Sequence, residues 1–493
     1  MTSTWEHHIP QAPPPEAVGR LVEQTRGQVL LPRDAAYEAE LAGYNRISGH
    51  RPALIVVALC DAHVRAAVDF ARTWELPVGV QATGHGPAAS SAGGLLLSTR
   101  HLRSVTVDPV TRTARAAAGA QWHQVITLAA HHGLAPLNGS SPTAGVVGYT
   151  LGGGLGLLAR KYGYAADHVT RIEVVTADGV PRVACPAENP GLFWALRGGK
   201  GNFGVVTALE FALVPVSRLY GGGLFFPGEQ AGRALRVWRK WTDTVPEEMT
   251  SSLALLRLPD LPETPEPLRG RLTVQLRIAH AGPPEEGERL VEPLRALRPM
   301  LDTVGDMPYT AVGDIHMDPD GPQEYHQNSL MLADLGDDAV ARLLALAGES
   351  ADCDDYVIEL RHLGGAAGRA PAQPNAVGHR DARFALTTIS PPSPPSPPSP
   401  PPSGPMAPGS APAAPLMDAL APWSTGLKYV NFLAGPGTAG SAATAYDRET
   451  YARLGQLKAT WDPENLFRLN HNIPPAPDRA IEVPHPPATT ERP

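Results

Sequence analysis

The residue whose type and surroundings most clearly indicate chemistry is a histidine that lies between two glycines. His85 has Gly84 before it and Gly86 after it, and it follows the apolar segment 78–82. Because glycine lacks a Cβ, a flat ligand can approach the backbone here, and main-chain N–H groups can face an anion such as a pyrophosphate. The same pattern occurs in ordinary turns. Whether His85 lies in a ligand-binding loop or in a plain turn therefore depends on the loops that follow in the sequence.

Two further glycine-rich loops favour a ligand-binding interpretation. In residues 138–163, glycines recur along an extended segment, as expected where backbone lies against a long flat ligand. Residues 196–207 repeat the pattern, and Asn202 in this loop can hydrogen-bond the edge of a ring. Each loop alone could be a plain turn. Together with the His85 loop, they indicate one extended cofactor.

The 138–163 loop also contains a spacing typical of NAD-binding proteins. Gly154, Gly156 and Ala159 form a GxGxxA pattern, and Glu173 lies about where a ribose-binding carboxylate is expected. However, the helix that this interpretation needs would run only from Leu155 to about residue 162, and Glu173 precedes an apolar run that such a carboxylate should end. An NAD-dependent dehydrogenase stays an alternative that the pattern does not favour.

The segments that must position the His85 loop alternate between strand and helix patterns. Residues 55–58 predict a strand, residues 61–72 a helix, and residues 78–80 a second strand that leads into the loop. Short β-branched runs and helical patterns continue to about residue 215 and predict a mixed α and β domain. Residues 16–42 have helical spacing and mixed charge, which predicts a surface helix after a proline-rich start.

A second region follows, and its clearest feature is an alternating strand over residues 272–278. Such alternation predicts a sheet with one covered face. Helical patterns over residues 231–241 and 285–297 would cover that face. Farther along, residues 391–403 read PPSPPSPPSPPPS, a polyproline II spacer that cannot form a core. Residues 429–433 then look like a strand, and residues 451–461 like a helix.

Charge and cysteine content exclude several classes of protein. The 493 residues include 41 lysines and arginines and 49 aspartates and glutamates, a net charge of −8, so no basic surface is expected to hold nucleic acid or anionic lipid. Three widely spaced cysteines fit neither a disulfide framework nor a zinc site, and the histidine pair 131–132 and His471 lack further ligands at metal spacing. Without a signal-like start or a membrane-length apolar run, we expect a soluble, cytoplasmic protein with no metal.

Taken together, these motifs give the sequence a specific family resemblance. It resembles the vanillyl-alcohol oxidase type of FAD flavoproteins, and within them the berberine-bridge-enzyme-like oxidoreductases. The resemblance rests on QATGHG at 81–86, the glycine stretch that ends in RKYG at 160–163, TADG at 176–179, FWALRGG at 193–199, GNFGVVT at 201–207 and DPENLFRLNHNIPP at 462–475.

The resemblance implies an α+β fold and a division of the chain. An FAD-binding domain of two subdomains would be followed by a substrate domain, in which helices cover an antiparallel sheet that forms a roof over the flavin ring. We therefore expect an N-terminal tail and helix at 1–45, the FAD-binding domain at 46–217, the substrate domain at 218–390, a proline-rich linker at 391–416, a C-terminal segment that returns to the FAD domain at 417–476, and a tail at 477–493.

The resemblance also implies how FAD is held. His85 falls on the position whose imidazole bonds covalently to the C8 methyl of the isoalloxazine. Many relatives have a second tether, a cysteine, where this chain has Ser141, so one covalent bond is expected. The other expected cofactor contacts are Ala82, Thr83, Gly84, Gly86, Pro87, Ser141, Pro142, Thr143, Gly145, Gly148, Tyr149, Gly152, Gly153, Gly201, Asn202, Gly204, Val205, Val206, Asn470 and Asn472.

The residues that would move protons are less clear, because the sequence departs from the family at several positions. Tyr149 replaces a frequent histidine, Lys200 interrupts a run that is usually all glycine, and Phe432 and Leu386 stand where relatives carry a base. The remaining catalytic candidates are Tyr429 and, on one face of the predicted strand 356–362, Glu359 and Arg361. A structural ion pair and a packed core tyrosine are the alternatives for these three residues.

The function expected from the resemblance is that of an FAD-dependent oxidase. It would take a hydride from a C–H bond of a hydroxyl- or amine-bearing small molecule, such as a secondary metabolite or a sugar, with oxygen as the acceptor that gives hydrogen peroxide. The alternatives are a flavin-binding protein without turnover, suggested by the missing bases, and the NAD-dependent dehydrogenase.

Overall fold

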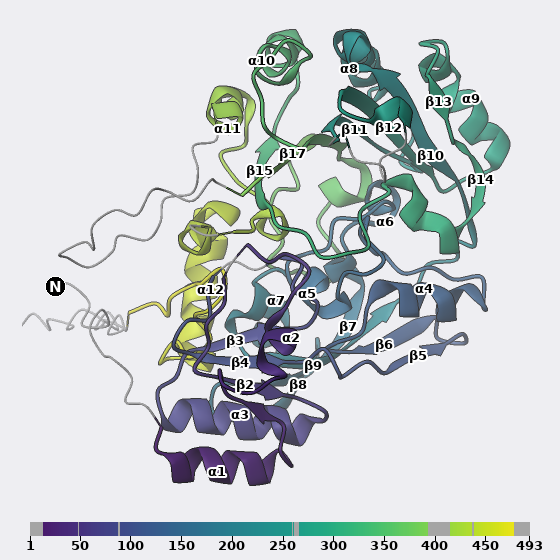
Figure 1. The fold of residues 1–493 in the computed structure, drawn as a ribbon. Helices are drawn as coiled ribbons and strands as arrows, with labels where there is room; N and C mark the ends of the chain where they lie inside the picture. The colour runs from purple at the N-terminus through teal and green to yellow at the C-terminus, as the bar shows by residue number, and fades with distance from the viewer. Residues whose placement is uncertain are drawn as a thin grey trace, which may run out of the picture.

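The computed structural model describes residues 13–47, 49–86, 89–258, 260, 266–392, 415–435 and 438–477. Three sheets form two layers (Figure 1). The first sheet has the order β1-β2-β4-β3, with β2 parallel to β4 and β4 parallel to β3. It consists of β1 (Val29–Leu30), β2 (Leu54–Val57), β3 (Val78–Gln81) and β4 (Leu95–Ser98), packed against α1 (Pro15–Gln24), α2 (Tyr37–Leu41) and α3 (Asp61–Thr73).

The second sheet is antiparallel and has the order β5-β6-β9-β7-β8. Its strands are β5 (Val105–Asp108), β6 (Thr113–Ala117), β7 (Val169–Val175), β8 (Pro181–Ala184) and β9 (Val205–Ala212), and the helices near it are α4 (Trp122–Ala130), α5 (Val146–Leu151), α6 (Ala159–Tyr162) and α7 (Pro190–Leu196). The first two sheets together form the lower layer, which we call the floor (Figure 1).

The third sheet lies above the floor, and we call it the roof. Its order is β13-β10-β12-β11-β16-β17-β15, with β14 paired to β10, and all its pairings are antiparallel. The strands are β10 (Arg218–Pro227), β11 (Met249–Arg257), β12 (Leu272–His280), β13 (Leu301–Asp302), β14 (Gly305–Pro308), β15 (His326–Leu332), β16 (Val357–His362) and β17 (Phe384–Ser390). The predicted α+β class and helix-covered antiparallel sheet are confirmed.

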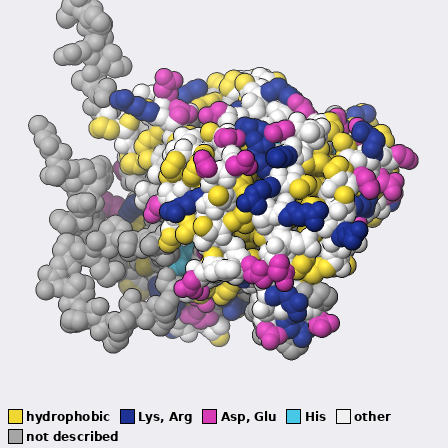
Figure 2. All heavy atoms as spheres, turned by 90° about the horizontal axis from the view of Figure 1, so that it is seen from above, with side chains coloured by type: hydrophobic (Ala, Val, Ile, Leu, Met, Phe, Trp, Pro, Cys, Tyr) yellow, Lys and Arg dark blue, Asp and Glu magenta, His cyan; other side chains and the backbone are white. Residues whose placement is uncertain are grey.

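Four helices cover the outer face of the roof: α8 (Ala231–Trp241), α9 (Pro284–Arg295), α10 (Asp337–Ala347) and α11 (Pro415–Leu420) (Figure 1). Their outward surface carries basic and acidic side chains interspersed (Figure 2). Beneath these helices, Val274, Leu276 and Ile278 of β12 join the apolar core. The prediction that β12 belongs to a sheet with only one covered face is wrong, because Gln275 and Arg277 on its other face are also buried. That second face looks toward the floor.

Two further predicted elements differ from the structure. Residues 16–42 do not form one surface helix, because β1 separates α1 from α2 and pairs with β2, so this part belongs to the first sheet. Residues 429–433 do not form a strand, because residues 430–432 make a 3₁₀ turn in which Asn431 donates its side-chain amide to the carbonyl of Tyr149. The predicted spacer at 391–403 falls almost wholly outside the described residues.

The C-terminal helix α12 (Arg448–Trp461) lies against the floor, beside α7 (Figure 1). Lys458 on this helix is fully buried, and its Nζ donates to Asp462 Oδ2 at 2.6 Å and to the carbonyl of Asn202 at 2.7 Å. Asp462 in turn accepts the backbone N–H groups of Leu466 and Phe467. This buried pair therefore fastens the C-terminal segment to the third glycine loop. Among the described residues, no helix combines the length and apolar character needed to cross a membrane.

We predict that Lys458→Met lowers the free energy of unfolding by roughly 3–5 kcal/mol, because it leaves the Asp462 carboxylate buried without its counter-charge. Chemical denaturation of the wild type and the variant measures the difference. Lys240→Met on α8, at an exposed position, is the matched control and should change stability by less than about 0.5 kcal/mol. A loss for Lys458→Met no larger than that of the control would contradict the assignment.

Candidate functional site

A cavity of about 1590 Å³ separates the floor from the roof. All three glycine loops reach it from below, and strands β10, β11, β12, β16 and β17 line it from above. Most of the residues predicted to contact a cofactor line this cavity: Ala82, Thr83, Gly84, His85, Gly86, Ser141, Gly145, Gly148, Tyr149, Gly201, Gly204, Val205, Val206 and Asn470. Segments far apart in the sequence therefore meet around one space, as the motifs predict.

The other predicted contacts lie behind the lining or outside the described residues. The residues behind the lining are Pro142, Thr143, Gly152, Gly153, Asn202 and Asn472. Asn202 is buried, and its side chain hydrogen-bonds to backbone groups of Gly199, His471 and Ile473. Its role in this structure is to join the third loop to the C-terminal segment rather than to reach into the cavity. Pro87 is not among the described residues.

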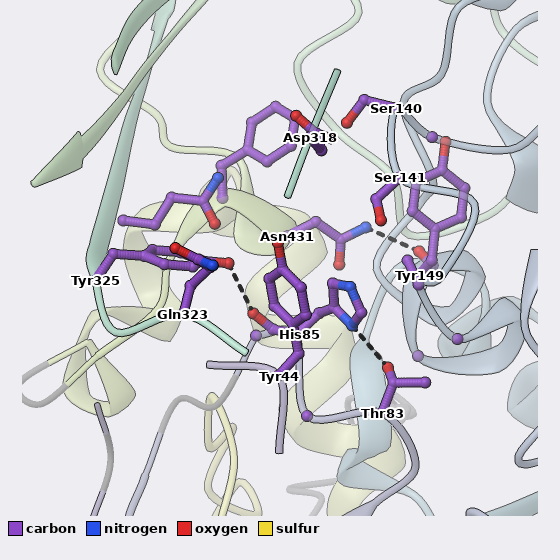
Figure 3. A pocket seen from close by; sticks show the side chains of 18 of the residues that line it. Tyr44, Thr83, His85, Ser140, Ser141, Tyr149, Asp318, Gln323, Tyr325 and Asn431 are labelled. Atoms are coloured by element: carbon purple, nitrogen blue, oxygen red, sulfur yellow. Dashed lines mark hydrogen bonds between the residues drawn. The ribbon is translucent and has the colours of Figure 1, made fainter. Parts of the chain in front are cut away.

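His85 is held by contacts on several sides (Figure 3). Its ring stacks on Tyr44, with centroids 4.0 Å apart and planes 2° from parallel. Nδ1 lies 2.9 Å from the hydroxyl of Thr83, and Nε2 lies 3.4 Å from the hydroxyl of Thr143. Burial lowers the pKa of His85 to about 4, so the imidazole is neutral at pH 7. A neutral imidazole has a free electron pair and can act as a nucleophile.

The backbone of this loop explains why glycine precedes His85. Gly84 has φ +69°, and a Cβ there would come within 2.6 Å of the Cα of Gly43. Only glycine combines this conformation with so close an approach. Tyr325 covers the loop from the other side and donates its hydroxyl hydrogen to the carbonyl oxygen of His85 at 3.2 Å (Figure 3). The sequence carries no signal that would have identified Tyr44 and Tyr325 as neighbours of His85.

A half-buried lysine marks another part of the cavity wall. Lys200 Nζ donates to Asn431 Oδ1 at 2.5 Å. Asn431 Nδ2 in turn donates to the carbonyl of Tyr149 at 2.8 Å (Figure 3). Burial lowers the pKa of Lys200 to about 8, and Lys200 forms no ion pair with a carboxylate of the described residues. The residue that breaks the glycine run therefore places a basic group at the cavity lining.

The lining fits a large flat cofactor such as FAD. A Cβ added at Gly86 or Gly148 would meet nothing within 4 Å, so open space reaches the backbone at both positions. Asn470 also lines the cavity, and its Oδ1 is buried without a hydrogen-bond partner in the described structure. Buried polar atoms rarely stay unpaired, which favours a ligand that donates a hydrogen bond at this position.

The roof contributes a cluster of charged groups centred on Glu359, which lines the cavity together with Arg361, as predicted from their shared strand face. Glu359 Oε1 accepts from Arg277 Nη1 at 2.8 Å and from the hydroxyl of Ser252 at 2.7 Å. Glu359 Oε2 accepts from Arg361 Nε at 2.9 Å. His316 Nε2 lies 3.2 Å from Oε1 and must carry a hydrogen, because an ionised carboxylate only accepts.

The environment of Glu359 makes it a poor general base. Burial alone would raise the pKa of this carboxyl, but the positive charges of Arg361 and Arg277 hold it well below its ordinary value. Both oxygens are also occupied by donors. Glu359 therefore organises the arginines, whereas a base near neutral pH needs a pKa closer to 7. The ion-pair alternative for Glu359 and Arg361 is the one that this geometry supports.

Tyr429 is placed differently from the other two catalytic candidates. It is buried in an apolar cluster and does not line the cavity. Asn431 Nδ2 lies 3.4 Å from its hydroxyl oxygen, and burial raises the pKa of the phenol well above its ordinary value. This position fits a packed core tyrosine better than a proton acceptor.

The residues that suggested an NAD-binding site have other roles in the structure. Glu173 lies in the middle of β7, where Arg115 Nη2 donates to it at 2.6 Å and Arg171 also bonds to it. The helix that follows Gly154 and Gly156, α6, begins only at Ala159 and has four residues. A dinucleotide fingerprint needs a longer helix that starts in the glycine turn.

Arg160 on α6 fastens the floor to the roof. Its buried guanidinium donates to the carbonyl of Met249 at 2.8 Å and to Nε2 of His362 on β16 at 2.8 Å. It also donates to the carbonyl of Leu363. Because Arg160 donates to it, His362 must present an unprotonated Nε2. Burial, with the nearby charge of Arg160, lowers the pKa of His362 to about 3.

Comparisons with known proteins agree with this geometry. Residues 52–183 match the family described as FAD binding domain, and residues 428–474 match the family described as berberine and berberine like. The chain is 28% identical to (R)-6-hydroxynicotine oxidase of Paenarthrobacter nicotinovorans over 91% of this chain and 97% of that protein. It is 26% identical to an uncharacterized FAD-linked oxidoreductase of Bacillus subtilis (strain 168) over 92% of this chain and 98% of that protein.

Solved structures share the whole architecture. The crystal structure of 6-hydroxy-D-nicotine oxidase from Arthrobacter nicotinovorans matches with a TM-score of 0.75 and 25% identity, over 91% of this chain and 98% of that one. Xylooligosaccharide oxidase from Myceliophthora thermophila matches with a TM-score of 0.76 and 24% identity, over 94% of this chain and 100% of that one. The second likeness shows the fold alone.

We predict that His362 makes the protein less stable as the pH falls below 6.5. The unfolded chain then takes up a proton that the folded protein, with its pKa of about 3, does not, so the free energy of unfolding falls by up to about 1.4 kcal/mol per pH unit. His362→Asn keeps an acceptor for Arg160 and removes this loss. Denaturation at pH 7, 6, 5 and 4 measures the slope, and exposed His131→Asn should leave it unchanged. Equal slopes for the wild type and His362→Asn would contradict the prediction.

Proposed function

We propose, on the premise that this chain is an FAD-linked oxidoreductase of the berberine-bridge-enzyme-like type, that it is an oxidase of a small molecule that carries a hydroxyl or amine group. The observation that carries this proposal is the cavity itself, in which three glycine loops face a polar roof. When bound there, FAD would take a hydride from a substrate C–H bond and pass the electrons to oxygen, which gives hydrogen peroxide.

His85 is the residue that we assign to a single covalent bond with the C8 methyl of FAD. Its ring is neutral, is held in place by Tyr44 and Thr83, and lines the cavity. Bond formation replaces a C–H and an N–H bond by one C–N bond, so two electrons and two protons must leave, and oxygen can accept them. Ser141 instead donates to or accepts from Thr143 at 2.8 Å, which fits a hydrogen-bonding role.

The substrate would enter between this flavin site and the roof, where Glu359, Arg361 and Thr387 line the cavity. Glu359 holds Arg277 and Arg361 in place and is itself too acidic to accept a proton efficiently at neutral pH. This arrangement supports chemistry in which the substrate loses its hydroxyl or amine proton without a strong protein base. One named relative is an oxidase of 6-hydroxynicotine, a small molecule that carries a hydroxyl group and amine nitrogen, which supports this substrate class.

We predict that flavin stays with the protein after denaturation in acid, and that proteolysis releases a flavin-bearing peptide that contains His85. Mass analysis of that peptide identifies the attached residue. His85→Ala should release its flavin into the supernatant, while Ser141→Ala should retain it covalently, which makes Ser141→Ala the matched control. Flavin that leaves the denatured wild type would rule out the covalent bond.

Turnover is tested by a peroxide assay across a panel of alcohols, sugars and amines with the flavin-loaded protein. We expect at least one class to yield hydrogen peroxide, with equal amounts of substrate consumed and peroxide formed. Anaerobic mixing should bleach the flavin absorbance with the same substrate, since the electrons then have no acceptor. Bound flavin that no member of the panel bleaches would favour the alternative of a flavin-binding protein without turnover.

A further inference from the structure

We propose that the roof carries an oxyanion-binding site, formed by Arg361 and Arg277, which selects substrates that bear a carboxylate or a similarly acidic oxygen. The proposal rests on the proposed oxidase function and narrows its substrate class. Both arginines line the cavity, from neighbouring parts of the roof sheet: Arg361 from β16 and Arg277 from β12, with β11 between the two strands.

Each arginine keeps one terminal nitrogen free of protein partners. Arg361 donates from Nε and Nη2 to the Glu359 carboxylate. Arg277 donates from Nη1 to Glu359 and from Nε to Gln275 Oε1. Arg361 Nη1 and Arg277 Nη2 make no hydrogen bond in the described structure. A guanidinium offers five N–H donors and no acceptor, so these unused groups are suited only to an acceptor.

The charges in this cluster do not cancel. Arg277 and Arg361 contribute two positive charges, and Glu359 contributes one negative charge, because its pKa lies well below the ordinary value. His316 is neutral near pH 7, since burial and the neighbouring Arg277 lower its pKa, although Glu359 opposes this effect. One net positive charge therefore remains in a buried part of the roof. A charge so placed favours an anionic partner.

A protonated amine would not fit this part of the cavity. The only carboxylate in the cluster, Glu359, already accepts from both arginines, Ser252 and His316, so no oxygen remains for an ammonium group. Burial raises the pKa values of Tyr44 and Tyr325 at the His85 loop, and the charge of Asp318, which also lines the cavity, raises them further. Asp318 is therefore placed at the His85 loop.

Two further features shape the site for an oxyanion. Thr387 lies opposite Glu359 in the register of β16 and β17, lines the cavity, and has a buried hydroxyl without a partner. It can donate a further hydrogen bond to the same group. The guanidinium of Arg361 lies over the ring of Phe432, 4.9 Å from its centroid, which limits its movement. The donors are therefore held before a ligand arrives.

The test compares three probes of nearly equal size on the flavin-loaded protein: benzoate, benzamide and benzylamine. Binding is followed by calorimetry and by the change in flavin absorbance. Because hydrogen bonds between charged partners are stronger than those between neutral groups, we expect benzoate to bind at least about tenfold more tightly than either other probe. Benzylamine or benzamide binding as tightly as benzoate would overturn the proposal, as would the absence of benzoate binding.

Variants at Arg361 then locate the site. Arg361→Gln should weaken benzoate at least about tenfold and leave benzamide unchanged, whereas Arg361→Lys, which keeps the charge, should retain part of the benzoate preference. An unchanged benzoate affinity in Arg361→Gln would overturn the assignment. Failure of the oxidase proposal is recognised separately, by the absence of peroxide with every member of the substrate panel, and peroxide formation does not enter the binding comparison. The wild-type ranking of the three probes decides the proposal even if a variant does not fold.

Discussion

Burying a charged group costs free energy unless a partner compensates it, and three such groups join the parts of this protein. Arg160 reaches from the floor into the roof, where it donates to carbonyls and to His362. Lys458 reaches from the C-terminal helix to the carbonyl of Asn202 in the third glycine loop. Glu359 on β16 bonds to Arg277 on β12 and to Arg361 on its own strand. Such contacts are directional, whereas the apolar packing between the layers is not.

The two layers contribute different chemistry to the space between them. The floor offers backbone that a flat ligand can approach, a neutral histidine, hydroxyl groups and one basic side chain, Lys200, so it contributes mainly position and shape. The roof offers guanidinium groups around an acidic carboxylate, so its contribution is charge. This division follows from the sequence pattern, since the glycine loops connect elements of the floor, whereas the roof strands alternate apolar residues under the helices with polar residues toward the cavity.

The folded structure argues against the candidate catalytic bases that the sequence leaves. The sequence leaves Tyr429, Glu359 and Arg361 as candidates, yet one is packed in an apolar cluster and another is saturated by donors. A protein that binds its substrate beside fixed positive charge needs less from a base, because an acidic oxygen of the substrate loses its proton more readily there. Of the two departures from the family pattern, Phe432 lines the cavity beside Arg361, whereas Leu386 packs under the roof helices and does not reach the cavity.

Local sequence was sufficient to predict what depends on local geometry. Glycine around His85 indicated close backbone approach, and Gly84 adopts a conformation that requires it. The period of two placed Glu359 and Arg361 on one face of a strand. The motifs also predicted that three distant loops share one ligand. In contrast, the pKa of a side chain and the hydrogen-bond donors that it leaves unused depend on neighbours that lie far away in the chain.

Only the tertiary structure could therefore show that Arg277, 82 positions before Glu359, shares its carboxylate, and that Tyr44 stacks on His85. The tertiary structure also shows that residues 430–432 form a 3₁₀ turn and not the predicted strand, because Asn431 hydrogen-bonds to the carbonyl of Tyr149. Strand propensity describes how a segment fits a pleated surface, and it carries no information about which distant polar group will compete for its side chains. Residue type and spacing determined where a cofactor could lie, and long-range packing decided which groups remain free to act on it.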